Sequence, residues 1–350
     1  MISEISVENR KIGPDHPCFV IAEAGVNHNG NLRLAKRLIN TAARAGADAV
    51  KFQTFSTEKI ILRNAPKADY QTRNATHDET QFQMLKKLEL TEAQFGELSD
   101  YSRRKKILFL STPFDNESVE ILENLKIPAY KISSGELTNF PLLNMIASKK
   151  KPVIVSTGMA TLDEVGEAVS FFRKKKVRDL ALLHCTSNYP AAIDDANLRA
   201  IDTLYRSFNL PVGYSDHTLG IFVPLLAVAR GACIIEKHFT VDKNLPGPDH
   251  QASLDPGELK EMVLKIRMVE RALGSGEKKP TKSEEAMRTI ARKSLVAVKR
   301  IRKGTTITAD MIECKRPGSG ISPRHLPEII NSITKRTIPE DTLITWDMIE

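Results

Sequence analysis

The chain has 350 residues, of which 41% are hydrophobic and 27% are charged, as in a soluble globular protein with one large core and a smaller one. No apolar run approaches the ~20 residues that span a bilayer, and residues 1–13 lack a signal-peptide pattern, so we expect a cytoplasmic protein with no membrane partner. The net charge of +8 comes from scattered basic residues not interleaved with aromatic ones, which favours a solvated basic surface, or a field that attracts anionic substrates, over a nucleic-acid partner.

Eight short apolar runs that end in polar or small residues alternate with helical patterns along most of the chain. Continuous apolar runs are typical of strands buried on both faces of a parallel sheet. The runs are residues 18–25, 48–55, 107–114, 129–136, 152–159, 180–187, 211–217 and 233–240. The helical patterns are residues 32–45, 92–105, 117–125, 142–148, 162–175, 198–208, 221–230 and 256–273. This alternation predicts an α/β fold of the (β/α)₈ TIM-barrel type.

A doubly wound open sheet is the structural alternative, but its dinucleotide-binding form is disfavoured because no GxGxxG follows the first strand. One connection, residues 56–90, is unusually long. Long loops after barrel strands lie on the active-site face, so this segment is either a lid or an inserted surface excursion.

The C-terminal part differs from the rest in composition. Residues 1–273 form the predicted barrel domain, and the polar, glycine-opened segment 274–292 is typical of a linker. Residues 293–350 contain short β-type runs and predict a small β-rich second domain.

Polar residues that end successive barrel strands should meet at one face, where barrel enzymes carry their chemistry. They also need partners, because an unpaired buried charge is costly. These residues are Glu23, Asn27, Lys51, Gln53, Ser111, Thr112, Lys131, Ser134, Glu136, Ser156, Thr157, Ser215, Asp216, His217, Glu236, Lys237 and His238.

His217 and His238 end neighbouring strands and could share one divalent ion. With no cysteine beside them, they suit a nitrogen and oxygen site for Mn²⁺, Fe²⁺, Co²⁺ or Zn²⁺, with positions left open for water and substrate. The alternative is that each imidazole only makes hydrogen bonds within the barrel rim.

The strand lysines Lys51 and Lys131, together with Ser134, Ser156 and Ser215, indicate a cradle for a phosphate or carboxylate. A lysine could instead form a Schiff base with a carbonyl substrate. It could also pair with Glu23 or Glu136, and either glutamate could act as a general acid or base.

At these residues the chain resembles the bacterial sialic acid (nonulosonic acid) synthases. The motifs that carry the resemblance occur in order along the chain: IAEAGVNHNG, AVKFQTF, FLSTPFD, YKISSGE, STGMAT, LLHCTSNYP, GYSDHTLG, IEKHFT and PGPDH. KSLVAVKRIRKGTTIT and KRPGSGISP resemble the antifreeze-like (SAF, β-clip) domain of the same enzymes.

The resemblance implies a reaction of phosphoenolpyruvate (PEP) with an open-chain N-acyl hexosamine. It implies a divalent metal, Mn²⁺ first with Mg²⁺ or Co²⁺ as alternatives, held by His217 and His238. Glu136 would handle protons or orient water, and Arg316 would reach the sugar of the partner barrel in a domain-swapped homodimer. The sugar would be held by Glu23, Tyr189 and Asp249, with Glu23 also catalytic. PEP would be held by Lys51, Gln53, Thr112, Lys131, Ser134, Ser156, Ser215 and Ser187, with Asn188 as the alternative to Ser187.

The first expectation for the acceptor is N-acetylmannosamine, giving N-acetylneuraminate. The alternative is a bacillosamine-derived hexose, 2,4-diacetamido-2,4,6-trideoxy-mannose, giving N,N′-diacetyllegionaminate by the same chemistry. Two readings belong to other classes of protein. A Schiff-base aldolase would release no phosphate and would ignore a chelator, and a non-enzymatic binding module would leave the strand-end residues without a role.

Overall fold

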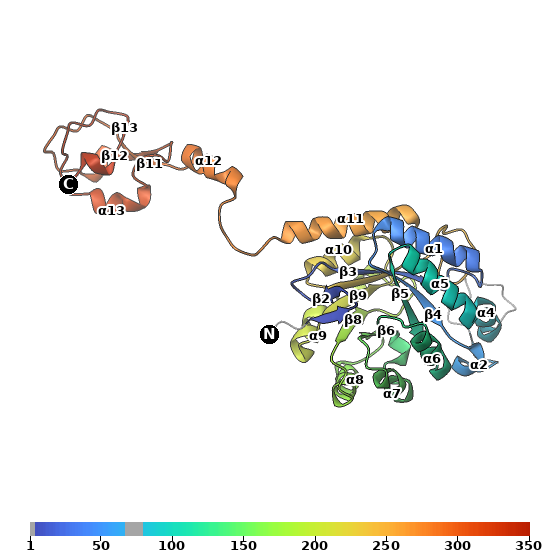
Figure 1. The fold of residues 1–350 in the computed structure, drawn as a ribbon. Coiled ribbons are helices and arrows are strands. Elements are labelled where there is room, and N and C mark those ends of the chain that lie inside the picture. Colours follow the sequence, from blue (N-terminus) through green and yellow to red (C-terminus); the bar gives the residue numbers. More distant parts are fainter. Residues whose placement is uncertain (1–3, 67–79) are drawn as a thin grey trace. The chain divides into compact units, whose positions relative to one another are not determined.

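The structure is a computed structural model that describes residues 4–66 and 80–350 (Figure 1). The chain divides into two compact units, Met1–Gly274 and Ser275–Glu350.

The first unit is a barrel of eight parallel strands, which confirms the predicted fold. The strands follow the order β5-β4-β3-β10-β9-β8-β7-β6 in the sheet. The two strands at the ends of this order, β5 and β6, lie against each other. The strands are β3 (Phe19–Gly25), β4 (Ala49–Thr54), β5 (Leu108–Pro113), β6 (Tyr130–Ile132), β7 (Val153–Ser156), β8 (Leu180–Cys185), β9 (Val212–Asp216) and β10 (Ile234–His238).

Helices surround the strands on the outside (Figure 1). In α1, Asn31 accepts a hydrogen bond from the Leu34 amide, Gly46 ends the helix in the left-handed conformation, and Leu38 and Ala42 face the core. The helices are α1 (Leu32–Ala45), α5 (Glu92–Arg104), α6 (Asn116–Asn124), α7 (Phe140–Ser148), α8 (Leu162–Lys174), α9 (Ala200–Phe208), α10 (Phe222–Ala229) and α11 (Pro256–Leu273). Short 3₁₀ turns are η1 (Ser134–Glu136) and η2 (Ile193–Asp195).

An N-terminal hairpin, which the sequence did not predict, covers the end of the barrel where the strands begin. Strands β1 (Ile5–Val7) and β2 (Arg10–Ile12) pair in antiparallel fashion. Ile5, Val7 and Ile12 are buried and join one apolar cluster with barrel residues. Those residues include Phe19, Ile21, Leu110, Ile154, Leu183 and Ile234. The floor of the barrel is therefore closed by side chains.

In its described residues, the long connection after β4 contains helices α2 (Thr57–Ile60) and α4 (Gln81–Leu88). Met84 and Leu88 of α4 pack with Val26 and Phe55, so this part of the connection lies against the loop that follows β3. Residues 67–79 of this connection, for which the sequence predicts either a lid or an inserted surface excursion, lie outside the described residues.

The second unit contains a small antiparallel sheet in the order β12-β11-β13. Its core includes Leu295, Ile307, Ile321 and Ile344. The segment predicted as a linker contains helix α12, which clusters with this unit. The elements are α12 (Lys282–Ala291), β11 (Ser294–Ala297), η3 (Ala309–Met311), β12 (Ile312–Lys315), η4 (Pro323–His325), α13 (Leu326–Ile329), β13 (Thr342–Leu343) and η5 (Trp346–Met348).

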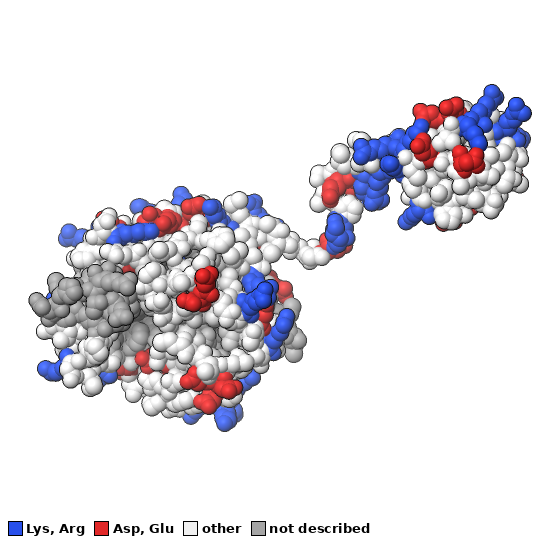
Figure 2. Space-filling view, turned by 180° about the vertical axis from the view of Figure 1, so that it is seen from behind, with Lys and Arg blue, Asp and Glu red and all other residues white. Residues whose placement is uncertain are grey.

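Charges of both signs share the molecular surface. On the face seen in Figure 2, Lys and Arg side chains of the barrel unit lie among Asp and Glu side chains. Many form exposed ion pairs, such as Lys149 with Glu120 at 2.6 Å and Lys265 with Glu261 at 2.6 Å. Among the described residues, no helix combines the length and apolar character needed to cross a membrane.

Candidate active site

Strand register brings the predicted polar residues together at one end of the barrel. Glu23 of β3 lies beside Lys51 of β4 on one side and beside His238 of β10 on the other. Glu236 of β10 pairs in register with Ser215 of β9. Because the strands are parallel, residues two apart on each strand point to the same side and form layers inside the barrel.

Two buried lysines and two buried glutamates form the deeper layer. Lys51 Nζ lies 2.7 Å from Glu23 Oε2 and donates to Thr112 Oγ1 at 3.1 Å. Lys131 Nζ donates to Ser156 Oγ at 2.7 Å. Glu236 stands between the two lysines.

The contacts of Glu236 join these groups into one network. Its Oε1 lies 3.4 Å from Lys131 Nζ and accepts from Ser215 Oγ at 3.0 Å, and its Oε2 lies 3.7 Å from Lys51 Nζ. Gln53 Nε2 donates to Glu23 Oε1 at 3.4 Å. Lys51, Lys131 and Ser215 therefore meet at the Glu236 carboxylate, for which the sequence predicted no role. Four further predicted residues join the same network through the lysines and Glu23: Glu23, Gln53, Thr112 and Ser156.

A signal for Glu236 is present in the sequence. It precedes His238 by two positions on β10, so both side chains point into the barrel. Lys237, between them, points the other way and pairs with Asp216. The spacing of Glu236 and His238 is visible in the sequence, whereas the pairing of Lys237 with Asp216 cannot be predicted from the sequence.

Burial controls the charges of this layer. Burial raises the pKa of the Glu23 carboxyl to about 7, with the Lys51 ammonium opposing the shift. It also lowers the pKa of Lys131 from its usual value. Burial favours neutral Glu236 as well, but Lys131 and Lys51 outweigh it and hold the pKa of Glu236 below its usual value. The layer thus holds ammonium groups ready for an anion in a site of low polarity.

The two histidines lie one layer nearer the mouth, with ring centroids 5.6 Å apart. His217 Nδ1 donates to the Thr186 carbonyl at 2.8 Å, which leaves the Nε2 lone pair available. His238 Nδ1 is buried and has no hydrogen-bond partner among the described residues, and burial lowers the pKa of this imidazole well below its usual value.

These features fit a metal ion with two imidazole ligands. Both rings are buried, and a deprotonated nitrogen on each can bind a divalent cation. Burial lowers the pKa of His217, but its contacts with Cys185 and the Thr186 carbonyl outweigh this and hold the pKa above its usual value. No cluster of three or more His, Cys, Asp or Glu side chains suited to a metal occurs within residues 4–66 and 80–350. The remaining coordination positions would thus belong to water and substrate, the arrangement of a catalytic rather than a structural site.

Two residues predicted for the sugar lie beside the histidines. The Tyr189 ring lies 4.0 Å from the His217 ring and 5.7 Å from the His238 ring, centroid to centroid. Asp249 Oδ2 lies 3.9 Å from His238 Nδ1, and burial raises the pKa of Asp249 to about 6. A carboxyl group and a phenol ring thus flank the histidines.

Ser134 and Ser187 meet above Gly158. A Cβ added at Gly158 would lie 2.3 Å from Ser187 Oγ and 2.8 Å from Ser134 Oγ, so a side chain there would displace both hydroxyls. The Gly158 amide donates to Ser134 Oγ at 2.9 Å. Asn188 instead uses its side-chain oxygen to accept from the Tyr189 amide at 3.0 Å. The hydroxyl of Ser187, rather than the Asn188 amide, thus adjoins Ser134.

Two predicted residues do not join these layers. Glu136, half-buried in η1, accepts a hydrogen bond from Asn139 Nδ2 at 2.6 Å. Arg316 belongs to the second unit, where it is exposed and its Nε donates to the Ala291 carbonyl at 3.1 Å. Its contact with a partner barrel stays a prediction.

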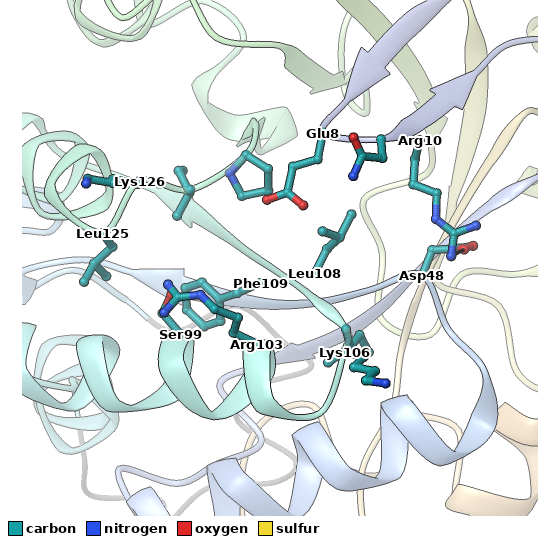
Figure 3. Close-up of a pocket in the computed structure, with 14 residues that line it drawn as sticks. Glu8, Arg10, Asp48, Ser99, Arg103, Lys106, Leu108, Phe109, Leu125 and Lys126 are labelled. Atoms are coloured by element: carbon teal, nitrogen blue, oxygen red, sulfur yellow. Dashed lines mark ion pairs between the residues drawn. The ribbon is translucent and has the colours of Figure 1, made fainter.

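A separate cavity of about 310 Å³ lies at the opposite end of the barrel (Figure 3). Its walls come from the hairpin turn at Glu8 and from residues that precede β4, β5 and β6, such as Asp48, Ile107 and Pro128. None of the residues predicted for substrate or metal lines it.

Comparison with known proteins agrees with this architecture. The NeuB family matches residues 38–278, and the SAF domain matches residues 292–350. The N,N′-diacetyllegionaminic acid synthase of Legionella pneumophila is 49% identical, with 98% of this chain and 99% of the relative covered. The N-acetylneuraminate-9-phosphate synthase of Mus musculus is 38% identical, with 97% and 95% covered.

A solved structure gives the same result. The crystal structure of the N-acetylneuraminic acid (sialic acid) synthetase of Leptospira borgpetersenii, in complex with citrate, has a TM-score of 0.73 and 41% identity, with 82% of this chain and 95% of that chain covered. The chain therefore belongs to the NeuB family of enzymes. The match to the SAF domain confirms the prediction that the C-terminal region is an antifreeze-like (SAF) domain.

Proposed function

We propose that this enzyme condenses PEP with the open-chain form of an N-acyl hexosamine, giving a nonulosonic acid and inorganic phosphate. The observation that carries the proposal is the pair of buried ammonium groups, Lys51 and Lys131, one layer below His217 and His238. An anionic substrate at the lysines would lie beside a second substrate at the histidines.

PEP carries a phosphate and a carboxylate, which the two lysines and the surrounding hydroxyl groups can bind. The Ser156, Ser215 and Thr112 hydroxyls already contact Lys131, Glu236 and Lys51, respectively, so they lie within this layer. Ser134 and Ser187 line its edge at Gly158. Their hydroxyls support a phosphate position near Gly158.

The reaction forms one carbon–carbon bond and one carbon–oxygen bond to water, and it breaks the carbon–oxygen bond to phosphate. PEP C3 attacks the aldehyde carbon of the sugar, water adds at PEP C2, and the resulting tetrahedral carbon expels phosphate. A divalent ion bound by His217 and His238, for which we propose Mn²⁺ before Mg²⁺ or Co²⁺, would supply Lewis-acid polarisation of the aldehyde oxygen.

The protein's own groups handle protons and charge. Because its pKa is about 7, Glu23 can carry a proton and deliver it to the oxygen that becomes a hydroxyl group. The lysines balance the charge of the departing phosphate. Glu136, at the rim, is proposed to orient the water.

The sequence predicts two candidate acceptor sugars, and the comparisons favour the second, which is the precursor of N,N′-diacetyllegionaminate. The legionaminic acid synthase is 49% identical, whereas the N-acetylneuraminic acid synthetase of the solved structure is 41% identical. We therefore place 2,4-diacetamido-2,4,6-trideoxy-mannose first and N-acetylmannosamine second. Tyr189, Asp249 and Glu23 are proposed to hold either sugar, and Arg316 of a domain-swapped partner is proposed to reach its acyl group.

Phosphate release from PEP tests the function. Manganese-loaded protein is incubated with each sugar, with and without EDTA, and phosphate is measured. We expect release with one sugar that depends on that sugar and stops with EDTA. A Schiff-base aldolase would instead release no phosphate and would be trapped by borohydride at a lysine. No release with either sugar from folded, metal-loaded protein would refute the proposal.

A further inference from the structure

Asn27 ties the end of β3 to two distant points of the chain. It lies in the VNHNG motif, two residues after β3, and its side chain is fully buried. Its Nδ2 donates to the Phe239 carbonyl at 2.8 Å and to Ser253 Oγ at 2.9 Å. Both acceptors lie more than 200 residues further along the chain, on either side of the loop that follows β10.

Ser253 carries this connection to Asp249. The Ser253 hydroxyl donates to the Asp249 main-chain carbonyl at 2.6 Å, while it accepts from Asn27. A line of two hydrogen bonds therefore runs from the end of the first barrel strand to the main chain of Asp249. The Asp249 carboxylate lies 3.9 Å from His238 Nδ1.

A second contact between the same two loops limits the freedom of the Asp249 segment. Asn29 Nδ2 donates to the Pro246 carbonyl at 2.7 Å. Gly247 has φ +145°, and a Cβ there would lie 2.8 Å from Asn29 Oδ1. The loop before Asp249 thus lies directly against the VNHNG motif, so the motif restrains it from both sides.

The hydrogen bonds of Asn27 are one-sided. Its Nδ2 makes both contacts, whereas its Oδ1 is buried without a hydrogen-bond partner among the described residues. Losing the amide would leave the Phe239 carbonyl without this donor, at a cost of about 1–3 kcal/mol for an unsatisfied buried group. The amide therefore ties the two loops together through its donor side alone.

We propose that Asn27 is a positioning residue for the acceptor sugar: through Ser253 it fixes the main chain at Asp249 and so the direction of the Asp249 carboxylate. This inference rests on the proposed function, in which Asp249 holds the acceptor. PEP is assigned to the layer below, which Asn27 and Ser253 do not contact. Acceptor binding should therefore depend on this line of hydrogen bonds, whereas PEP binding should not.

Ser253→Ala tests the proposal with the smallest change, since it removes one oxygen and leaves the contact of Asn27 with Phe239. We expect the KM for the acceptor to rise about 10-fold or more, because small misplacements of binding groups can cost up to about 100-fold, while the KM for PEP stays within about 2-fold. Ser253→Thr, which keeps the hydroxyl group, should recover most of the loss. Ser102→Ala, at a buried serine of α5 whose Oγ has no partner among the described residues, is the matched control and should leave both KM values unchanged.

Amide hydrogen exchange of the same variants gives a readout independent of turnover. Ser253→Ala should speed exchange at residues 250–254 about 10-fold and leave the barrel strands unaffected. Unchanged exchange there, or an equal rise of both KM values, would overturn the inference. Wild-type protein that releases no phosphate with either sugar would refute the proposed function, and with it the acceptor role of Asn27, whereas altered exchange would still show the anchoring itself.

Discussion

Lys131 and Glu236 form an ion pair of 3.4 Å whose side chains are 2% and 7% exposed. Removing one partner of a buried pair leaves a charge without compensation, at a cost of about 3–5 kcal/mol. We expect Lys131→Met and Glu236→Gln each to lower the free energy of unfolding by about 3 kcal/mol. The double variant should lose clearly less than the sum, as measured by urea unfolding followed by circular dichroism.

The activity of the double variant should separate the proposed binding role of Lys131 from its contribution to stability. The double variant should keep the fold and still lose turnover of PEP, because Lys131 is proposed to bind it. Strictly additive losses of stability in the double variant would show that the two groups do not act as a pair.

Metal binding should depend on both histidines. His217→Ala or His238→Ala should reduce manganese affinity and activity at least about 100-fold, since loss of even an outer-shell partner typically costs 10–100-fold. Isothermal titration of metal-free protein with Mn²⁺ measures the affinity directly. His184→Asn, at a half-buried histidine whose Nε2 contacts the Ala196 carbonyl at 2.9 Å, is the control. Full metal binding by both alanine variants would contradict the assignment.

The barrel and the end of the barrel that carries the site could be predicted because both follow from short-range patterns. Eight apolar runs mark the strands, and parallel strands place their carboxyl ends together. The network around Glu236 could not be predicted, since it depends on which strand neighbours which and in what register. Helix α12 was missed because it buries no residue in its unit, so only its cap at Thr281 marked it.

The hairpin was missed for another reason. Strands of three residues are too short to show alternation, and Ile5, Val7 and Ile12 are recognisable only by what they cover. We expect Ile12→Ala to destabilise the barrel by about 2–5 kcal/mol, as for other buried large-to-small changes. The KM for each substrate should be unchanged, because the hairpin lies at the far end of the strands. An Ile12→Ala variant with unchanged stability but a raised KM would contradict a purely structural role for the hairpin.

His28 makes stability depend on pH. Burial lowers its pKa to about 4, whereas histidine in an unfolded chain titrates near 6.5. Between these values the unfolded chain takes up a proton that the folded protein does not, so stability falls as pH falls. The loss from this group should reach about 3 kcal/mol at pH 4, and His28→Gln should remove it. If the free energy of unfolding, measured in urea, depends on pH equally in the wild type and in His28→Gln, the dependence does not come from His28.

Arg316→Ala should weaken use of the acceptor and spare the fold, since the side chain is exposed and its one described hydrogen bond is to the Ala291 carbonyl. Acceptor kinetics and gel filtration measure the two effects. Exposed Arg300→Ala in the same unit is the matched control. Unaltered acceptor kinetics would remove Arg316 from the proposed site.

The closed floor of the barrel has a consequence for the order of events. With Ile5, Val7 and Ile12 filling the end where the strands begin, both substrates must pass through the same mouth. On β10, Glu236 and the lysine layer lie two residues below His238. A sugar bound at the histidines would therefore close the path to the lysines. For the proposed substrates we therefore expect PEP to enter first and phosphate to depart last, and we expect excess acceptor to inhibit by occupying the empty enzyme.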